Sequence, residues 1–192
     1  MFIQTEDTPN PDAITFFPGQ EISSDQPVFF SELAEVKGRS KLAASLFHIN
    51  NVKSVFFGSD FITVTKQAEG NWQVIKPEIL MVIMDHFVSG FPVFEENTKA
   101  DNVNHNLDGL SEIEKQIVEI IETRVRPSVA QDGGDIIYKG FENGVVKLAL
   151  RGACLGCPSS TITLKNGIES MLKHFVPEVQ EVEAVEEAVE EV

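Results

Sequence analysis

Short runs of β-branched and aromatic residues, bounded by Pro, Gly, Asn and Asp, predict strands in the first half of the chain. These runs cover residues 2–5, 13–17, 52–57 and 61–66. Residues 40–47 and 77–88 instead place apolar side chains at helical spacing, and Pro77 suits a first helical turn. The mixture predicts a small α+β domain.

A helix signal opens the second half of the chain. Ser111 and Glu114 form a Ser-x-x-Glu capping box, and apolar residues then recur at helical spacing until Pro127. Asn143-Gly144 predicts a tight hairpin turn, with strands on either side of it at residues 136–141 and 145–150. The pattern therefore predicts an α+β fold for this half as well.

The C-terminal part of this half adds a helix and a strand. Pro158 opens the helix, directly after a Gly-rich loop that contains the cysteines. Val179, Val182 and Val185 supply a last strand before a Glu-rich end.

An Asn- and Asp-rich stretch with almost no apolar side chains separates the halves. Its sixteen residues, 95–110, would have a mean reach of about 20–25 Å if flexible. The prediction is therefore two small α+β domains joined by a flexible linker. The expected parts are an N-terminal domain at 1–94, the linker at 95–110, a cysteine-containing domain at 111–185 and an acidic tail at 186–192.

Charge and hydropathy limit the partners of the chain. The formal net charge is −15, which phosphate backbones repel, so no nucleic-acid partner is expected. No apolar run approaches the about 20 residues that span a bilayer, so no membrane partner is expected either. The first residues lack the features of a signal peptide or a transit peptide. We therefore expect a cytoplasmic, bacterial protein, with a processed mitochondrial form left open.

The two cysteines, Cys154 and Cys157, form one Cys-x-x-Cys element. Burial as small hydrophobes is disfavoured, because both lie in a Gly-flanked loop. A thioredoxin-like redox pair fits a motif that precedes a helix, since a helix N-terminus stabilises thiolate, but this motif follows a hairpin and not a βαβ unit. Zinc and an iron–sulfur cluster both normally require four ligands, two more than this pair offers.

Histidines are poor candidates for the missing ligands. His174 lies about 24 Å from Pro158 along the helix axis. His48 and His86 belong to the other domain and His105 to the linker.

Two copies of the cysteine loop around one cofactor would supply four sulfurs, which leads to a symmetric dimer. Gly152 and Gly156 would let the backbone turn around the sulfurs, and helix amides after Pro158 could offset a negative charge. A cofactor shared in this way is easier to release than one enclosed by a single chain, so delivery is favoured over permanent electron transfer.

Several motifs resemble a known family. Residues 152–160, Gly-Ala-Cys-Leu-Gly-Cys-Pro-Ser-Ser, continuing to residues 163–169, resemble the cluster-binding signature of the NifU C-terminal domain. The same domain is matched upstream by Asp132-Gly133-Gly134-Asp135 and downstream by Val176-Pro177-Glu178-Val179. Residues 5–19, centred on Thr8-Pro9-Asn10-Pro11, resemble the N-terminal domain of Nfu proteins of the mitochondrial and related bacterial type.

The resemblance to NifU-like (Nfu) proteins implies an iron–sulfur cluster scaffold or carrier with no catalytic residue. It implies a 4Fe-4S cluster held by Cys154 and Cys157 at a homodimer interface, with a 2Fe-2S form left open. The implied partners are a second copy of the chain, upstream cluster-assembly proteins and apo iron–sulfur proteins that receive the cluster. The alternatives are a thiol–disulfide oxidoreductase and a zinc-bridged structural dimer.

Overall fold

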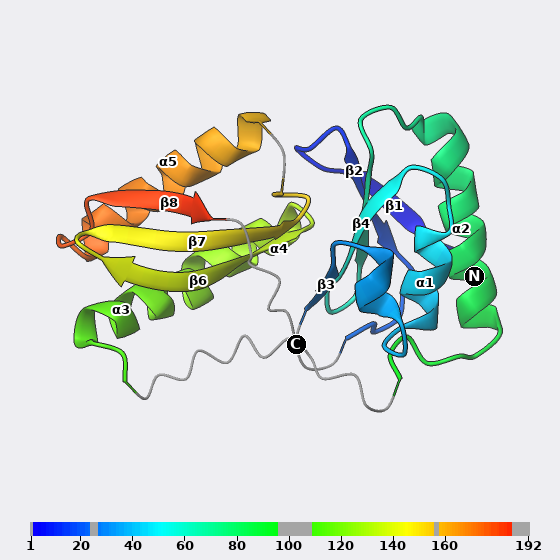
Figure 1. Cartoon of the computed structure of the whole chain (residues 1–192), viewed down its shortest axis with the longest axis horizontal. Helices are drawn as coiled ribbons and strands as arrows, with labels where there is room; N and C mark the ends of the chain where they lie inside the picture. Colours follow the sequence, from blue (N-terminus) through cyan, green and yellow to red (C-terminus); the bar gives the residue numbers. More distant parts are fainter. Residues whose placement is uncertain (1, 24–26, 96–108, 156–157, 186–192) are drawn as a thin grey trace. The chain divides into compact units, whose positions relative to one another are not determined.

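The structure is a computed structural model of the chain, and it describes residues 2–23, 27–95, 109–155 and 158–185 (Figure 1). It contains two compact units, Met1–Asn102 and Val103–Val192. The α+β class predicted for both halves is confirmed. The predicted linker and tail fall almost entirely outside the described residues, so the three boundaries between the four predicted parts stay predictions.

Unit 1 is an antiparallel sheet with two helices on one face (Figure 1). The strand order is β1-β2-β5-β4-β3, and every pair of neighbours is antiparallel. Its elements are β1 (Gln4–Asp7), β2 (Ala13–Phe17), β3 (Val28–Phe30), the short 3-10 helix η1 (Leu33–Val36), α1 (Lys41–Phe47), β4 (Val52–Phe57), β5 (Ile62–Lys66) and α2 (Trp72–Val88).

The core of unit 1 lies between this sheet and the two helices. The largest fully buried side chains come from both layers, namely Phe16, Phe30, Phe57 and Ile62 from the strands and Leu42, Leu46, Ile79 and Ile83 from the helices. Burial of these side chains is the main stabilising contribution to the unit.

The Thr8–Asp12 loop is fixed by its own hydrogen bonds and by α2. The Thr8 hydroxyl lies within donating distance of Asn10 O (2.9 Å) and Ala13 O (3.0 Å), and Trp72 Nε1 donates to Pro11 O (3.0 Å). Asp12 also pairs with the buried Lys66 ammonium. The loop that carries the N-terminal family motif is therefore a rigid part of unit 1.

Two predicted elements of unit 1 begin at different residues in the structure. Helix α2 begins at Trp72 because the Asn71 side chain caps it by accepting from Gln73 N (2.9 Å). Pro77 therefore lies inside the helix and not in its first turn. Strand β1 is displaced by two residues from the prediction because it is a mostly exposed edge strand, in which burial does not fix the pattern.

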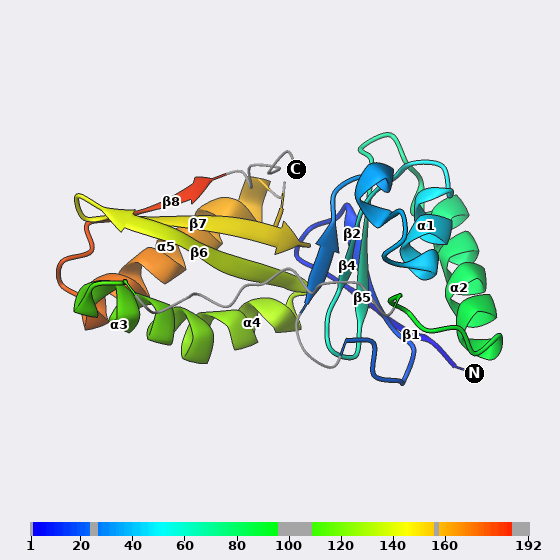
Figure 2. The ribbon, with the colours of Figure 1, turned by 60° about the horizontal axis from the view of Figure 1, so that its bottom comes forward.

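Unit 2 packs its helices against one face of a three-stranded sheet (Figure 2). Its elements are α3 (Glu112–Ile120), the π-helical turn η2 (Ile121–Val125), α4 (Arg126–Gln131), β6 (Gly134–Glu142), β7 (Val145–Gly152), α5 (Pro158–Phe175) and β8 (Glu181–Val185). Strands β6 and β7 form an antiparallel hairpin, and β8 joins β7 in parallel after the α5 crossover.

Local signals fixed several features of unit 2. Ser111 and Glu114 form the predicted capping box. Asn143 and Gly144 have φ values of 51° and 83°, the left-handed conformation that a two-residue hairpin turn requires.

The first helix of unit 2 does not end at Pro127 as predicted but continues to Gln131. The turn before the proline is widened, and Arg126 N donates to Ile121 O five residues back. Such a π turn accommodates a residue that lacks an N–H and whose ring crowds the preceding turn. No helix in the described ranges is long and apolar enough to span a bilayer.

The core of unit 1 predicts a large contrast between two neighbouring residues of α2. Ile83 is fully buried, whereas Met81 is 65% exposed. We expect Ile83→Ala to lower the free energy of unfolding by about 2–5 kcal/mol, because it leaves a cavity in a packed core. Met81→Ala is the matched control and should change it by less than about 0.5 kcal/mol.

Urea unfolding followed by Trp72 fluorescence measures this contrast. Trp72 is the single tryptophan of the chain and lies in unit 1, so the signal reports that unit alone. Equal effects of the two substitutions would contradict the assigned core.

Candidate metal centre

The β6–β7 hairpin brings two separate glycine-containing loops together at one end of its sheet. In the hairpin register Gly134 is paired with Gly152, and Asp135 is paired with Arg151. Beyond these strand ends, Ala153 N donates to Gly133 O (3.1 Å). The Asp-Gly-Gly-Asp motif at residues 132–135 therefore lies beside the start of the cysteine loop.

The loop turns sharply directly after β7. Gly152 has a φ of 62°, a conformation that glycine adopts without strain, and Leu155 N donates to Gly152 O (3.1 Å). Gly156 and Cys157 lie outside the described residues. The structure therefore positions Cys154, whereas the role predicted for Cys157 stays a prediction.

Cys154 is more buried than its loop position predicts. Its exposed fraction is 5%, and it packs in the same core as Ile136, Leu148 and Ile168. The expectation that a cysteine here has little to pack against is therefore wrong for Cys154, because the hairpin folds Gly134 and the strand ends around it.

Gly134 allows the closest of these contacts. A Cβ atom added at Gly134 would lie 2.5 Å from Cys154 Sγ and 2.9 Å from Arg151 O. Both separations are shorter than van der Waals contact, so no larger residue fits without movement of the loop. Gly134 thus leaves room for the sulfur.

An ion pair fixes the start of β6, where Gly134 lies. Arg126 of α4 donates to both carboxylate oxygens of Asp135, from Nε (2.8 Å) and Nη2 (2.9 Å), and from Nη1 to Glu122 (2.8 Å). Burial acts to lower the pKa of Arg126, but the hydrogen bonds and charges of Asp135 and Glu122 outweigh it and raise that pKa. The charge of Arg126 is therefore maintained, and Asp135 attaches the start of β6 to α4.

A second polar contact attaches α3 to the middle of β6. Tyr138 Oη donates to Glu114 Oε1 (3.0 Å), and Glu114 belongs to the capping box of α3. Burial, followed by this hydrogen bond, raises the pKa of Tyr138. Hydrogen bonds from Ser111 lower the pKa of Glu114, so the carboxylate stays charged and accepts the hydrogen bond from the tyrosine hydroxyl.

The histidines lie away from Cys154 or outside the described residues. His174 is exposed in the last turn of α5, and His48 Nδ1 lies 2.6 Å from Ala44 O. His86 is buried in unit 1, where desolvation lowers its pKa, and His105 falls outside the described ranges. Among the described residues, no three His, Cys, Asp or Glu side chains form a group that could hold a metal ion.

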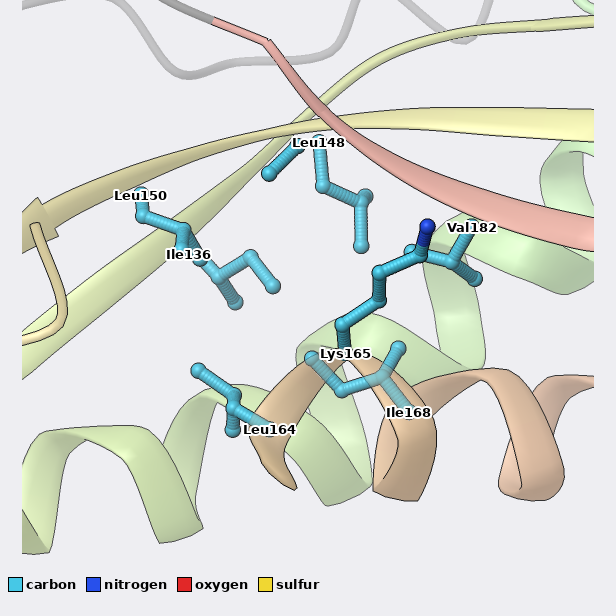
Figure 3. Close-up of a pocket in the computed structure, with 8 residues that line it drawn as sticks. Ile136, Leu148, Leu150, Leu164, Lys165, Ile168 and Val182 are labelled. Atoms are coloured by element: carbon cyan, nitrogen blue, oxygen red, sulfur yellow. The ribbon is translucent and has the colours of Figure 1, made fainter. Parts of the chain in front are cut away.

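A small pocket between α5 and the sheet has an apolar lining (Figure 3). Leu164 and Ile168 of α5 lie across from Ile136 of β6 and Leu148 of β7. The one charged group among the lining residues, Lys165, pairs with Glu181 (3.2 Å). We interpret the pocket as a packing gap and not as a ligand site.

Both halves of the chain match known families. Residues 3–90 match the family described as "Scaffold protein Nfu/NifU N terminal", and residues 117–183 match the "NifU-like domain". The chain belongs to the Nfu/NifU scaffold family.

The sequences of two named relatives support this assignment. The human "NFU1 iron-sulfur cluster scaffold homolog, mitochondrial" is 50% identical over 186 residues, which cover 96% of this chain and 72% of the human protein. The protein of the same name from Drosophila ananassae is 46% identical and is covered over 66% of its length, slightly less than two thirds. A solution structure of a NifU-like protein from Saccharomyces cerevisiae is 26% identical with a TM-score of 0.46, over 50% of this chain and 86% of that chain.

These relatives correct one expectation. The prediction of a cytoplasmic, bacterial protein is wrong, because the relatives are named mitochondrial proteins. A mature mitochondrial domain and its bacterial counterpart obey the same folding constraints, so composition and hydropathy do not separate the two locations.

The contact between Gly134 and Cys154 can be tested through the reactivity of the thiol. In a Cys157→Ser background, Gly134→Ala should raise the rate at which a thiol reagent modifies Cys154 several-fold, because the added methyl group displaces the loop. The free energy of unfolding should fall by about 1–3 kcal/mol.

Gly167→Ala is the matched control for this substitution. A Cβ there meets nothing within 4 Å, and a helical Gly→Ala change should stabilise the protein by about 0.5–1 kcal/mol. If the Gly134→Ala variant leaves the reactivity of Cys154 unchanged, the buried position of the sulfur does not depend on this glycine.

The Tyr138–Glu114 contact predicts a loss of stability at alkaline pH. The pKa of Tyr138 is raised in the folded protein. As pH rises, the unfolded chain therefore loses the phenolic proton first, at the reference pKa of tyrosine, about 10. The stability contributed by neutral Tyr138 is fully present below about pH 10 and is lost as pH rises towards the folded pKa.

Tyr138 is the only tyrosine of the chain, so tyrosinate absorbance reports this group directly. Its titration midpoint should lie above 10 in buffer and fall to about 10 in urea. Glu114→Gln should lower the native midpoint without abolishing the shift, because burial remains. A native midpoint of about 10 would rule out the contact.

Proposed function

We propose that this protein is a non-catalytic iron–sulfur cluster carrier that binds a 4Fe-4S cluster as cargo between two copies of the chain. Cys154 and Cys157 of each copy ligate the cluster, which then passes to apo-proteins. Upstream assembly proteins supply it, and a 2Fe-2S form remains the alternative cargo.

The observation that carries the proposal is the position of Cys154. Cys154, the first cysteine of the Cys-x-x-Cys motif, lies just beyond the end of β7, next to Gly134 and the Gly133–Ala153 hydrogen bond. An iron–sulfur cluster takes four thiolate ligands as a rule, and two copies of this loop supply four. The family to which the chain belongs, and the scaffold names of its relatives, favour the same cargo.

The burial of Cys154 suggests how the cluster is held loosely enough for delivery. With 5% of its surface exposed, Cys154 must move towards its partner copy before its sulfur can ligate iron. Backbone hydrogen bonds from Ala153 and Leu155 help to hold the loop closed, each with a net contribution of about 0.5–1.5 kcal/mol. Cluster binding would open the loop against these contacts, so closure of the loop favours release of the cargo.

The N-terminal part, residues 1–94, has a separate role in this proposal. It supplies no cluster ligand and contributes to recognition of other proteins. The location is mitochondrial, as for the named relatives.

A thiol–disulfide oxidoreductase is the second candidate. Helix α5 begins at Pro158, directly after the cysteine pair, and a helix N-terminus stabilises a thiolate. Such an enzyme would work as a metal-free monomer, whereas a zinc-bridged dimer would be colourless.

Anaerobic reconstitution with iron and sulfide distinguishes these functions. We expect a brown dimer with about two irons and two sulfides per chain, measured with the molecular mass on the same sample. Mössbauer spectra then separate one shared 4Fe-4S cluster from one 2Fe-2S cluster in each chain. A colourless monomer with two thiols would instead support the redox enzyme.

The ligands are tested by single substitutions. Cys154→Ser and Cys157→Ser should each abolish the cluster, because either change removes half of the four thiolates from the dimer. Ser170→Ala, at an exposed site on α5, is the control and should retain it. Full cluster content in either cysteine variant would refute the ligand assignment.

A further inference from the structure

The outer face of α2 and the residues just beyond it carry an exposed apolar stripe. The stripe consists of Val74, Pro77, Met81, Met84, Val88 and Phe91. Five of these side chains are strongly exposed, from 41% for Met84 to 73% for Val88. We refer to these six residues as the α2 stripe.

The spacing of the stripe is regular. Successive members are separated alternately by three and four residues, which is the a/d pattern by which one helix packs against another. Single exposed apolar residues are common on protein surfaces, but a row in register over the whole length of a helix marks an interaction surface. Helix α2 has 17 residues, so the row extends for about 25 Å.

The fold of unit 1 does not require this row. The inward face of α2 is formed by Ile75, Ile79, Ile83 and His86, which are all buried. At about 100° per residue, the α2 stripe lies on the opposite side of the helix. A surface helix of a globular protein needs only one apolar face, so the second face is available for a partner.

The borders of the α2 stripe differ in charge. If Met81 is given heptad position a, Glu78 and Asp85 both occupy position e. These two acidic side chains therefore lie along the same border of the stripe. The other border carries Leu80 and Phe87, which pack against the core of unit 1. The surface is thus apolar with one acidic border, and one cation, Lys41 Nζ, lies 5.4 Å from the ring centroid of Phe91 at its end.

This charge pattern selects among occupants. Two copies in antiparallel contact would place the acidic borders against each other, and like charges at these positions are unfavourable. Membrane surfaces are anionic and attract basic segments, whereas residues 1–110 carry fifteen acidic and seven basic side chains, a net charge of −8. A basic partner helix satisfies both the apolar row and its acidic border.

We propose that the α2 stripe docks an amphipathic helix of another protein, with an apolar a/d seam and Lys or Arg residues that face Glu78 and Asp85. Met81 and Met84 suit this use, because flexible thioether side chains adapt to different apolar partners. The inference goes beyond cluster carriage and needs neither cysteine. Unit 1 is then a docking module for proteins that present such a helix.

The probe is a synthetic helical peptide of about three heptads with Leu at a and d and Lys along one border. A matched peptide carries Glu in place of each Lys. Fluorescence anisotropy measures binding of both peptides to the full-length chain. The Lys peptide should bind at least about tenfold more tightly, and added salt should reduce the difference.

Variants of the stripe test its apolar part. Met81→Gln and Val88→Gln should each weaken binding of the Lys peptide about tenfold, since each removes an apolar contact from the centre or end of the seam. Both side chains are exposed, so thermal unfolding should not change. Lys53→Gln, at an exposed position of β4, is the control and should bind as the unchanged protein does.

A charge exchange tests the acidic border. The double variant Glu78→Lys, Asp85→Lys should bind the Glu peptide more tightly than the Lys peptide, a reversal of preference. Equal binding of the two peptides, no binding of either, or an unreversed preference in the double variant would overturn the proposal.

Two further outcomes would show that the α2 stripe binds a different occupant, and either would overturn the proposal. One is a dimer of the apo-protein in sedimentation that Met81→Gln dissociates. The other is binding to anionic phospholipid vesicles that Met81→Gln abolishes. The Cys154→Ser, Cys157→Ser double variant should still bind the Lys peptide, which keeps this test separate from the test of the cluster site.

Discussion

The close packing of Gly134 against the sulfur of Cys154 is the contact on which the candidate site depends. The Asp-Gly-Gly-Asp turn and the cysteine loop are nearly twenty residues apart in sequence, and the antiparallel register of β6 and β7 brings them together. Because an added Cβ would lie 2.5 Å from the sulfur, a side chain at residue 134 and a sulfur in this position exclude each other. The first residue of β6 therefore sets the position of a thiol in the loop that follows β7.

Polar contacts from the long N-terminal helix of unit 2 hold this arrangement in place. Arg126 pairs with Asp135, next to Gly134, and Tyr138 donates to Glu114 further along the same strand. The side chain of Asp135 is 5% exposed, so loss of Arg126 would remove two hydrogen bonds and a positive charge from a buried carboxylate. That is a costly state, and it makes the pair a strong determinant of where β6 begins.

The two units differ in which apolar surfaces they bury and which they leave exposed. Unit 2 buries one face of a three-stranded sheet and places its thiol at the sheet end. Unit 1 completes its core with one side of α2 and leaves the opposite, equally apolar side exposed. In the proposed carrier, unit 2 would hold the cargo and unit 1 would bind other proteins.

The sequence by itself determined those features that depend on neighbours along the chain. The Asn143-Gly144 turn and the Ser111–Glu114 capping box each follow from the chemistry of adjacent residues, and both are present in the structure. The extended sequence around the cysteines at residues 152–160, together with the Thr8-Pro9-Asn10-Pro11 segment, likewise indicated the family that the domain matches confirm. Helix α2 shows the limit of such local signals. Pro77 suggested a helix start at residue 77, but the Asn71 cap and the burial of Ile75 place the start at Trp72.

Only the tertiary structure decided what depends on residues far apart in sequence. The burial of Cys154, its contact with Gly134 and the Arg126–Asp135 pair arise when α4, β6 and β7 pack together. The apolar residues of α2 are visible in the sequence, but only packing shows which side of the helix faces the core and which faces solvent. Local patterns specify elements because backbone conformation and capping are short-range, whereas burial and ion pairing depend on which surfaces the folded chain brings into contact.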